Sequence, residues 1–317
     1  MMNLNNYSLL AGDASFRKFY RSTRNSIIVF SKKNKHLNLA VYDAINRCLN
    51  KNKVKAPRIK KQFYNKNYIE IEDLGNVSLF NLLKKKKYKS KIYFKVIKIL
   101  QSLQKIKSKS IITFKRKKYI IPQYTKLKLF DEANFFLEWY LPKIIKKKKI
   151  KKAKNEIKII LINLLNKLKL NKKVFVHRDF HVSNMMYHKK KIYLIDNQDA
   201  VYGNIAYDLA SLIDDVRLKT SRNLKGKIFK LYIKLNSSID QNKFKNDFEI
   251  LSVLRNLKII GIFTRLSVRD KKNKYLKLIP YAWKLIEQRL KKNPNFYDLK
   301  EVLRKYFSNR VRKKYEN

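Results

Sequence analysis

The sequence predicts an α+β fold with a small β-rich N-terminal lobe and a larger, mostly helical C-terminal lobe. Three observations lead to this prediction. Up to about Gly75 the chain reads mainly as short strand-like runs, and beyond it apolar residues recur at helical spacing. Two short strand-like segments, residues 174–176 and 191–195, interrupt the helical part and are predicted to form a hairpin. We therefore divide the chain into residues 1–75 and 76–317.

The first lobe is predicted to hold strands and one helix. Residues 16–20 and 26–30 are rich in aromatic and β-branched side chains and flank the polar stretch 22–25, which predicts two paired strands joined by a turn. Residues 39–49 place apolar side chains on one face of a helix. Residues 68–71 are predicted to form a further strand.

The second lobe is predicted to be built from helices whose apolar residues recur at intervals of three and four. One of them, at residues 155–170, carries its lysines mainly on the face opposite its apolar residues, which indicates packing against a core rather than insertion in a membrane. The expected helices are residues 77–83, 92–106, 127–139, 155–170, 229–235, 248–265 and 281–290.

The composition indicates a folded chain of 317 residues, 45% of them hydrophobic. Cys48 is the only cysteine, so an intrachain disulfide is excluded and a reducing, cytoplasmic location is expected. The first residues lack the basic and apolar segments of a signal peptide. Residues 157–170 are too short and too charged to span a bilayer, so no membrane partner is expected.

The formal net charge of +54 has two interpretations. Lys, Asn, Ile, Tyr and Phe are abundant while Gly and Pro number five each, which is the pattern that an A/T-rich coding sequence produces. Alternatively, the charge could bind nucleic acid or an anionic membrane. We favour the compositional interpretation, because no RNA-recognition or helix-turn-helix signature accompanies the charge. The lysine runs at residues 84–87 and 146–152 are interpreted as solvated surfaces.

Residues 176–184, V-H-R-D-F-H-V-S-N, hold the strongest functional signal. Asp179 stands five positions before Asn184, which is the H-R-D-x-x-x-x-N spacing of a kinase catalytic loop, and Asp196 follows a strand-like segment. Phosphoryl transfer needs a carboxylate to accept the hydroxyl proton and hard oxygen ligands for Mg²⁺. We therefore predict Asp179 as the catalytic base, Asn184 and Asp196 as metal ligands, and ATP and Mg²⁺ as cofactors. Taken alone, Asp179 and Asn184 are equally well explained as turn residues after a strand.

Two histidines flank the predicted base. His177 is expected to be a buried, hydrogen-bonded organiser of the loop. His181 follows four residues later, and the two could in principle bind zinc together. Because the segment has neither the H-E-x-x-H glutamate nor an evident third ligand, we do not favour a zinc site.

The N-terminal segment A-G-D-A-S-F-R, residues 11–17, stands where a kinase has its glycine-rich loop. Gly12 would allow the backbone to approach phosphates closely, and the hydroxyl of Ser15 can donate a hydrogen bond to them. The segment has a single glycine and is not G-x-G-x-x-G, so an ordinary hairpin turn is the alternative.

Together with these segments, further blocks carry a resemblance that spans about residues 9–285. The chain resembles the cell-wall amino-sugar anomeric kinases, which phosphorylate N-acetylmuramate and N-acetylglucosamine at C1 and belong to the aminoglycoside/choline phosphotransferase group of protein-kinase-like folds. The blocks are L-A-G-D-A-S-F-R-K-F-Y-R (residues 10–21), A-P-R-I (56–59), E-D-L-G (72–75), E-W-Y-L-P (138–142), H-R-D-F-H-V-S-N-M-M (177–186), I-D-N-Q-D-A-V-Y-G-N-I-A-Y-D-L-A-S-L (195–212) and L-K-I-I-G-I-F-T-R-L-S-V-R-D (257–270).

The resemblance implies a bilobal fold with a nucleotide cleft between its lobes. Residues 1–75 would be the nucleotide-binding lobe and residues 76–317 the catalytic and substrate-binding lobe. Glu72, Asp73 and Leu74 would form the hinge, whose backbone groups read adenine.

The resemblance also implies roles for residues outside the loop. Asp208 would be a buried aspartate that braces the catalytic loop, and Gln198 and Asp199 would lie near the metals or the sugar. Arg265 and Arg269 could face an anionic group of the sugar, although a packing or surface role is equally compatible with each.

Two departures from the expected pattern matter. A protein kinase carries a lysine on its third strand, whereas residues 26–31, S-I-I-V-F-S, have none, and Lys32 and Lys33 come only afterwards. This leaves open how the phosphates are held. Asn197 stands where the resembled family usually has phenylalanine, which leaves open how the residues around the metal aspartate pack.

The expected function is ATP-dependent phosphorylation of an amino sugar in cell-wall recycling. One alternative is another small alcohol, namely choline, an aminoglycoside or homoserine. Cationic acceptors are less favoured, because an acidic rim would have to be built from only 23 acidic residues. The other alternative is a kinase-like scaffold that binds nucleic acid through its lysines, which predicts steeply salt-dependent binding.

Overall fold

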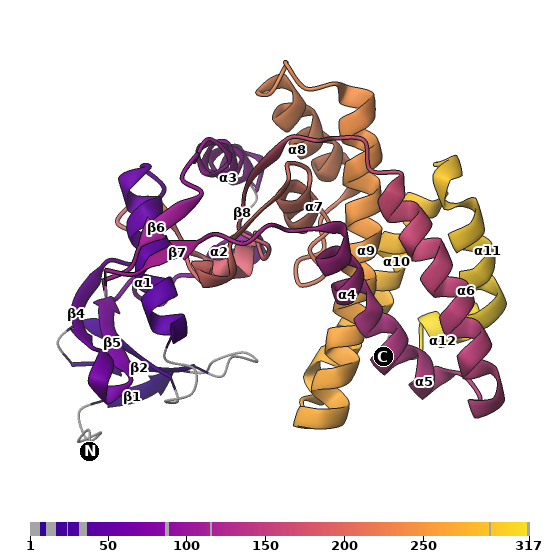
Figure 1. Cartoon of the computed structure of the whole chain (residues 1–317), viewed down its shortest axis with the longest axis horizontal. Coiled ribbons are helices and arrows are strands. Elements are labelled where there is room, and N and C mark those ends of the chain that lie inside the picture. Colours follow the sequence, from indigo (N-terminus) through magenta and orange to yellow (C-terminus); the bar gives the residue numbers. More distant parts are fainter. Residues whose placement is uncertain are drawn as a thin grey trace. The chain divides into compact units, whose positions relative to one another are not determined.

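The structure of the chain is a computed structural model (Figure 1). It forms two compact units, Met1–Gln123 with Val174–Tyr202, and Tyr124–Lys173 with Gly203–Asn317. We describe each unit by itself. The structure describes residues 7–10, 17–23, 25–31, 37–85, 89–114, 116–291 and 293–315.

The first unit contains a five-stranded antiparallel sheet in the order β1-β2-β3-β5-β4. The predicted pairing of two strands across a turn is confirmed by β2 and β3, although Phe16 lies outside the described residues. β3 lies in the middle of the sheet and is buried along most of its length, as its β-branched composition favours. The strands are β1 (Tyr7–Leu10), β2 (Lys18–Ser22), β3 (Ser26–Phe30), β4 (Ile59–Phe63) and β5 (Tyr68–Glu72).

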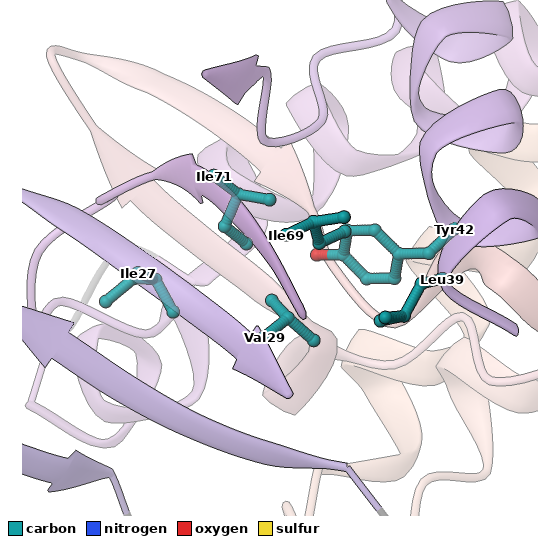
Figure 2. Close-up of a cluster of buried hydrophobic side chains, with 6 residues drawn as sticks. All are labelled: Ile27, Val29, Leu39, Tyr42, Ile69 and Ile71. Atoms are coloured by element: carbon teal, nitrogen blue, oxygen red, sulfur yellow. The ribbon is translucent and has the colours of Figure 1, made fainter. Parts of the chain in front are cut away.

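Helix α1 (Leu37–Lys51) packs against one face of this sheet. In Figure 2 the side chains from α1 lie against those that project from β3 and β5. The alternation along the strands puts every second residue on this face, and burying each such side chain contributes roughly 1.5–3 kcal/mol. The buried cluster consists of Ile27, Val29, Leu39, Tyr42, Ile69 and Ile71.

The predicted hairpin between residues 174–176 and 191–195 is wrong. β10 (Lys191–Leu194) pairs with β9 (Met185–His188), a strand that we did not predict, and β8 (Lys173–Val176) pairs with β11 (Val201–Asn204). The turn between β9 and β10 is Lys189–Lys190, with φ of 46° and 60°. Two positive φ values are typical of a type I′ hairpin turn, but the sequence lacks the Asn-Gly or Asp-Gly signal that normally marks one.

Two helices and a small hairpin complete the first unit. α2 (Leu79–Lys85) and α3 (Lys89–Gln104) correspond to the helices expected at residues 77–83 and 92–106. The hairpin is formed by β6 (Ser110–Ile112) and β7 (Lys118–Ile120).

The second unit is helical, and α9 is its central element. α9 is 30 residues long and buried over most of its length, and it packs against α4, α7 and α10 (Figure 1). The lysine run at residues 146–152 is largely exposed in the first turns of α6, which agrees with the predicted solvated surface. The α-helices are α4 (Lys126–Phe135), α5 (Leu141–Ile144), α6 (Lys147–Asn166), α7 (Tyr207–Ile213), α8 (Arg222–Lys234), α9 (Gln241–Asp270), α10 (Ile279–Leu290), α11 (Tyr297–Tyr306) and α12 (Asn309–Arg312).

The predicted α+β class is confirmed by the antiparallel sheet of the first unit and the helices that follow. The compact units divide the chain at other places than residue 75, because the first unit continues to Gln123 and residues 174–202 return to it. The division into nucleotide-binding and substrate-binding lobes remains a functional prediction. Among the described residues, no helix is long and apolar enough to cross a membrane.

Candidate active site

The loop after β8 brings Asp179 and Asn184 together. The chain leaves β8 at Val176 and turns at Arg178, whose φ of 74° is unusual for a residue other than glycine. The carbonyl of Asp179 accepts hydrogen bonds from the backbone N–H of His181 at 2.9 Å and from Nδ2 of Asn184 at 3.1 Å. Both predicted site residues are half-buried. The amide nitrogen of Asn184 is thus committed to the loop, and its oxygen is the atom left to bind a ligand.

Ile195, the residue before Asp196, is tied to the same loop through its backbone N–H and carbonyl. The N–H of Ile195 donates to the carbonyl of Asn184 at 3.0 Å, and Nε2 of His177 lies 3.1 Å from the carbonyl of Ile195. His177 is buried. Asp196 follows with a φ of 62°, a left-handed conformation that persists only where neighbouring contacts hold it. The structure therefore brings Asp179, Asn184 and Asp196 together at the ends of two short strands.

Gln198 connects two of the predicted acidic residues. Its Nε2 donates to Oδ1 of Asp196 at 3.1 Å and to Oδ2 of Asp199 at 2.6 Å. Gln198 is buried, whereas Asp199 is exposed and its carbonyl accepts a hydrogen bond from Arg178 at 3.3 Å. These bonds orient the carboxylate of Asp196 from the side of its own 3₁₀ turn, Asn197–Asp199.

Arg17 joins the site although sequence reasoning assigned it no role. Its Nη2 lies 2.7 Å from Oδ1 of Asp196, and the residue is only 5% exposed. The guanidinium lies 5.7 Å from the ring centre of Tyr42 and 6.0 Å from that of Phe19. Burial raises the pKa of Tyr42 to about 12, against the lowering effect of the Arg17 charge. The signal that could have found Arg17 is its place at the end of the A-G-D-A-S-F-R block.

Asn197 stands where the resembled family usually has phenylalanine, and its side-chain nitrogen is hydrogen-bonded to α1, whereas its buried Oδ1 has no partner among the described residues. Its side chain is fully buried, and its Nδ2 donates to Oδ1 of Asn46 at 2.9 Å and to the carbonyl of Leu194 at 3.0 Å. Asn46 in turn donates to the carbonyl of Pro57 at 3.2 Å. A polar pair, rather than an aromatic ring, therefore fixes the residue after Asp196 to helix α1.

The predicted hinge begins at Glu72, the last residue of β5, and continues through Asp73 and Leu74. The N–H of Glu72 donates to the carbonyl of Arg58, and the carboxylate of Asp73 pairs with Nε of Arg21 at 2.6 Å. Asp73 also accepts the N–H of Gly75 at 2.8 Å, in a turn where the φ of 74° at Gly75 suits glycine. Leu74 is buried, and no described residue hydrogen-bonds its backbone N–H or carbonyl.

Other predicted site residues lie elsewhere. Gly12 and Ser15 fall outside the described residues. Asp208, Arg265 and Arg269 belong to the second unit, where Asp208 is fully buried in α7. The roles predicted for all of them remain predictions.

Arg265 and Arg269, both in α9, differ in their surroundings. Arg265 is half-buried with its guanidinium 4.9 Å from the ring centre of Phe135, and burial together with the charge of Arg269 lowers the pKa of Arg265. The buried Nε of Arg265 has no hydrogen-bond partner among the described residues. Arg269 is exposed and pairs with Asp270 at 2.7 Å, which raises the pKa of Arg269.

The side-chain oxygens of Asn184 and Asp196 are of the hard type that suits a divalent cation. The side chain of Asp196 is 43% exposed, and the amide oxygen of Asn184 remains available. No group of three or more His, Cys, Asp or Glu residues that could hold a metal occurs in the described part of the chain. Two protein oxygens with the remaining positions filled by water and phosphate are typical of a Mg²⁺–nucleotide site.

Comparison with known sequences places the chain in context. The sequence profile of the phosphotransferase enzyme family matches residues 6–237. The N-acetylmuramate/N-acetylglucosamine kinase of Neisseria meningitidis serogroup B is 26% identical over 281 residues, covering 85% of this chain and 81% of the relative. The kinase of the same name from Pseudomonas putida is 24% identical over 301 residues, covering 92% of this chain and 86% of the relative.

Solved structures share the fold. A choline/ethanolamine kinase family protein from Mesorhizobium loti superposes with a TM-score of 0.62 at 12% identity and covers 94% of this chain and 92% of its own. The ADP-bound aminoglycoside phosphotransferase APH(2'')-Ib superposes with a TM-score of 0.61 at 13% identity, with coverage of 90% and 95%. These likenesses confirm the predicted kinase-like fold.

Proposed function

Because the chain belongs to the phosphotransferase enzyme family, we propose that this small-molecule kinase uses ATP and Mg²⁺ to phosphorylate the C1 hydroxyl of N-acetylmuramate and N-acetylglucosamine. The Neisseria meningitidis and Pseudomonas putida relatives, which are named N-acetylmuramate/N-acetylglucosamine kinases, match more than four fifths of the chain. The geometric observation that carries the proposal is the hydrogen-bonded junction of Asp179, Asn184 and Ile195. The product, a sugar 1-phosphate, would enter cell-wall recycling.

Asn184 and Asp196 would hold the metal ion. Their oxygens are of the hard type that Mg²⁺ prefers, and the contacts to Asp179 and Gln198 orient them before the ion arrives. When bound, the ion would neutralise charge on the nucleotide phosphates.

Asp179 would act on the acceptor. Its carboxylate orients the C1 hydroxyl toward the γ-phosphorus and takes the hydroxyl proton late, since the transition state of phosphoryl transfer is loose. The sugar oxygen forms a bond to phosphorus while the bond to the departing ADP oxygen breaks. The proton then passes from Asp179 to water. The loop fixes the backbone of Asp179 through its carbonyl, so the geometry supports a precisely placed carboxylate.

The nucleotide base would be read by the backbone at Leu74. Asp73 is engaged by Arg21 and Gly75 and therefore shapes the turn, whereas the N–H and carbonyl of Leu74 have no partner among the described residues. A backbone donor and acceptor next to a buried apolar side chain suit the edge and face of a purine.

Purified protein with ATP, Mg²⁺ and N-acetylmuramate should yield the sugar 1-phosphate, identified by coupling of phosphorus to the anomeric proton in NMR. D179A removes the proton acceptor and should lower kcat about 10²–10⁴-fold. N-acetylglucosamine should give the corresponding product. Turnover by the unchanged protein that is no faster than that of D179A would reject the proposal.

A panel of acceptors decides between this proposal and the other small alcohols. Choline, an aminoglycoside and homoserine are assayed beside the two sugars by coupled detection of ADP. If choline, the aminoglycoside or homoserine is turned over faster than the two sugars, that compound is assigned as the acceptor. Binding of RNA without turnover of any acceptor would favour the scaffold interpretation.

A further inference from the structure

The salt bridge between Arg17 and Asp196 joins residues 179 positions apart. The guanidinium is buried against the rings of Tyr42 and Phe19, while the side chain of its partner Asp196 is 43% exposed. The carboxylate therefore marks the side of the guanidinium at which a second anion can arrive.

A buried guanidinium keeps its proton and needs an anion beside it. Asp196 supplies that charge. A divalent cation bound to Asp196 would draw the same carboxylate away and place two further positive charges near Arg17. This arrangement is unfavourable unless another anion enters with the cation.

Strand β3 offers no cation that could bind the nucleotide phosphates. β3, Ser26–Phe30, contains no lysine, and the only acidic residue of α1, Asp43, pairs with Arg47 at 2.9 Å. The lysine–glutamate pair that joins strand and helix in protein kinases therefore has no counterpart between β3 and α1. A cation on the neighbouring segment, packed against Tyr42 of α1, occupies the space next to Asp196 instead.

We propose that Arg17 is the cation that binds the nucleotide phosphates, exchanging its contact with Asp196 for a phosphate oxygen when the metal–nucleotide complex binds. The proposal rests on the proposed kinase function and adds a phosphate-binding residue to it. A planar guanidinium suits phosphate because it presents paired donors to two oxygens. The contacts with the rings of Tyr42 and Phe19 restrict the orientation of this fork, so that the exchange needs no large movement.

The alternative is that Arg17 only positions Asp196. The two roles differ when no metal is present, because a positioning residue affects nucleotide binding only through the metal. ADP affinity is therefore measured by calorimetry with a chelator and, separately, with Mg²⁺. The variants are R17Q, R17K and D196N. R47Q serves as a matched control, since it removes the charge of another Arg–Asp pair in the same unit.

R17Q should bind ADP about 10- to 100-fold more weakly in both conditions, because a charged hydrogen bond to phosphate is lost. R17K keeps the charge without the fork and should bind between R17Q and the unchanged protein. D196N should bind ADP several-fold more tightly in the chelator, since a carboxylate that competes for Arg17 and repels phosphate is gone. R47Q should match the unchanged protein.

If R17Q and the unchanged protein bind ADP with equal affinity in the chelator, the inference is overturned. It is also overturned if R47Q lowers the affinity for ADP as much as R17Q does. If R17Q does not fold, as judged by its thermal transition, D196N still decides, because unchanged or weaker binding in the chelator contradicts the exchange. Failure of the sugar proposal is recognised separately. ADP would then bind as described while no acceptor sugar is phosphorylated.

Discussion

The carboxylate of Asp196 is held by one side chain from far earlier in the sequence and one from just after it. Arg17 and Gln198 contact the same oxygen, Oδ1, at 2.7 and 3.1 Å, and the next residue, Asn197, is fixed to Asn46 of α1. The left-handed backbone of Asp196 is strained, and these contacts offset that cost. A predicted metal ligand is thereby held in one orientation before any ligand binds.

Substitutions of Arg265 and Arg269 should differ in their effect on the acidic sugar. Arg265 is partly desolvated and has a buried Nε without a partner among the described residues, whereas Arg269 is neutralised by Asp270. If Arg265 binds the carboxylate that distinguishes N-acetylmuramate, R265Q should raise KM for that sugar about tenfold and leave KM for N-acetylglucosamine within about twofold. R269Q should leave both within about twofold.

Steady-state kinetics on both sugars measure this difference. Equal losses on the two sugars in R265Q would indicate a packing role against Phe135 instead. A larger selective loss in R269Q would assign the contact to the other arginine.

At the scale of elements, helices α9 and α4 cross at Gly261. A Cβ at this position would lie 2.3–2.5 Å from backbone atoms of Phe135 and Phe136, at the junction where α4 passes into a π-helical turn. The two helix backbones therefore come so close that only glycine fits, because moving backbone atoms costs more free energy than moving the end of a side chain.

G261A should therefore destabilise the protein by about 3 kcal/mol, since one of the two backbones must shift. G226A is the matched control. Gly226 lies within α8, and a methyl group there would meet no atom within 4 Å, so alanine should stabilise by about 0.5–1 kcal/mol through helix propensity. Urea unfolding followed by circular dichroism measures both. A neutral G261A would show that the crossing tolerates a methyl group.

Asp214 joins three helices at the end of α7. Its buried carboxylate accepts from Lys225 of α8 at 2.9 Å, from Arg289 of α10 at 2.8 Å and from Ser252 of α9. Burial alone would raise the pKa of Asp214, but the charges of Arg289 and Lys225 hold it below the ordinary value of an aspartate.

D214N should destabilise the protein by about 3–5 kcal/mol at pH 7, because Lys225 is left buried without its anion. A lowered folded-state pKa means that the contribution of Asp214 is fully present above the unfolded value of about 4 and is lost as the pH falls through the folded value. The difference between D214N and the unchanged protein should therefore shrink below about pH 4. E301Q, in the exposed pair with Arg304, should change stability by less than about 1 kcal/mol. Urea titrations at several pH values test this, and a difference that grows in acid would contradict it.

At the scale of the whole molecule, charge repulsion should weaken the fold. The chain carries 77 Lys and Arg residues against 23 Asp and Glu residues. Many of these positive charges lie within one Debye length of one another at low salt, and added salt screens their repulsion. Raising KCl from about 20 mM to about 300 mM should therefore raise Tm by several degrees.

Calorimetry in KCl and in potassium glutamate measures this effect. Equal rises in both salts indicate screening, whereas a rise in one salt alone would indicate specific anion binding. A Tm that falls or stays constant would contradict net repulsion in the folded state.

Patterns among residues close together in the sequence predicted the fold class, most of the elements and the candidate site residues. Residue spacing within a few turns or one strand predicted the β-rich start, the strand at residues 26–30 and the helices, and the structure agrees with these elements. The same short-range spacing singled out Asp179, Asn184 and Asp196. The motif spacing also predicted phosphotransferase chemistry, because Asp179 and Asn184 lie in one short, continuous loop and Asp196 follows soon after it in the sequence.

Only the tertiary structure decided which distant segments meet. β10 pairs with β9 rather than β8, and Arg17 pairs with Asp196 across 179 positions. Asn197 could be buried in place of an aromatic residue because Asn46 stands opposite it. The physical reason is that strand pairing, salt bridges and close helix crossings depend on contacts between residues far apart in the chain, whereas periodicity and motif spacing report only on near neighbours.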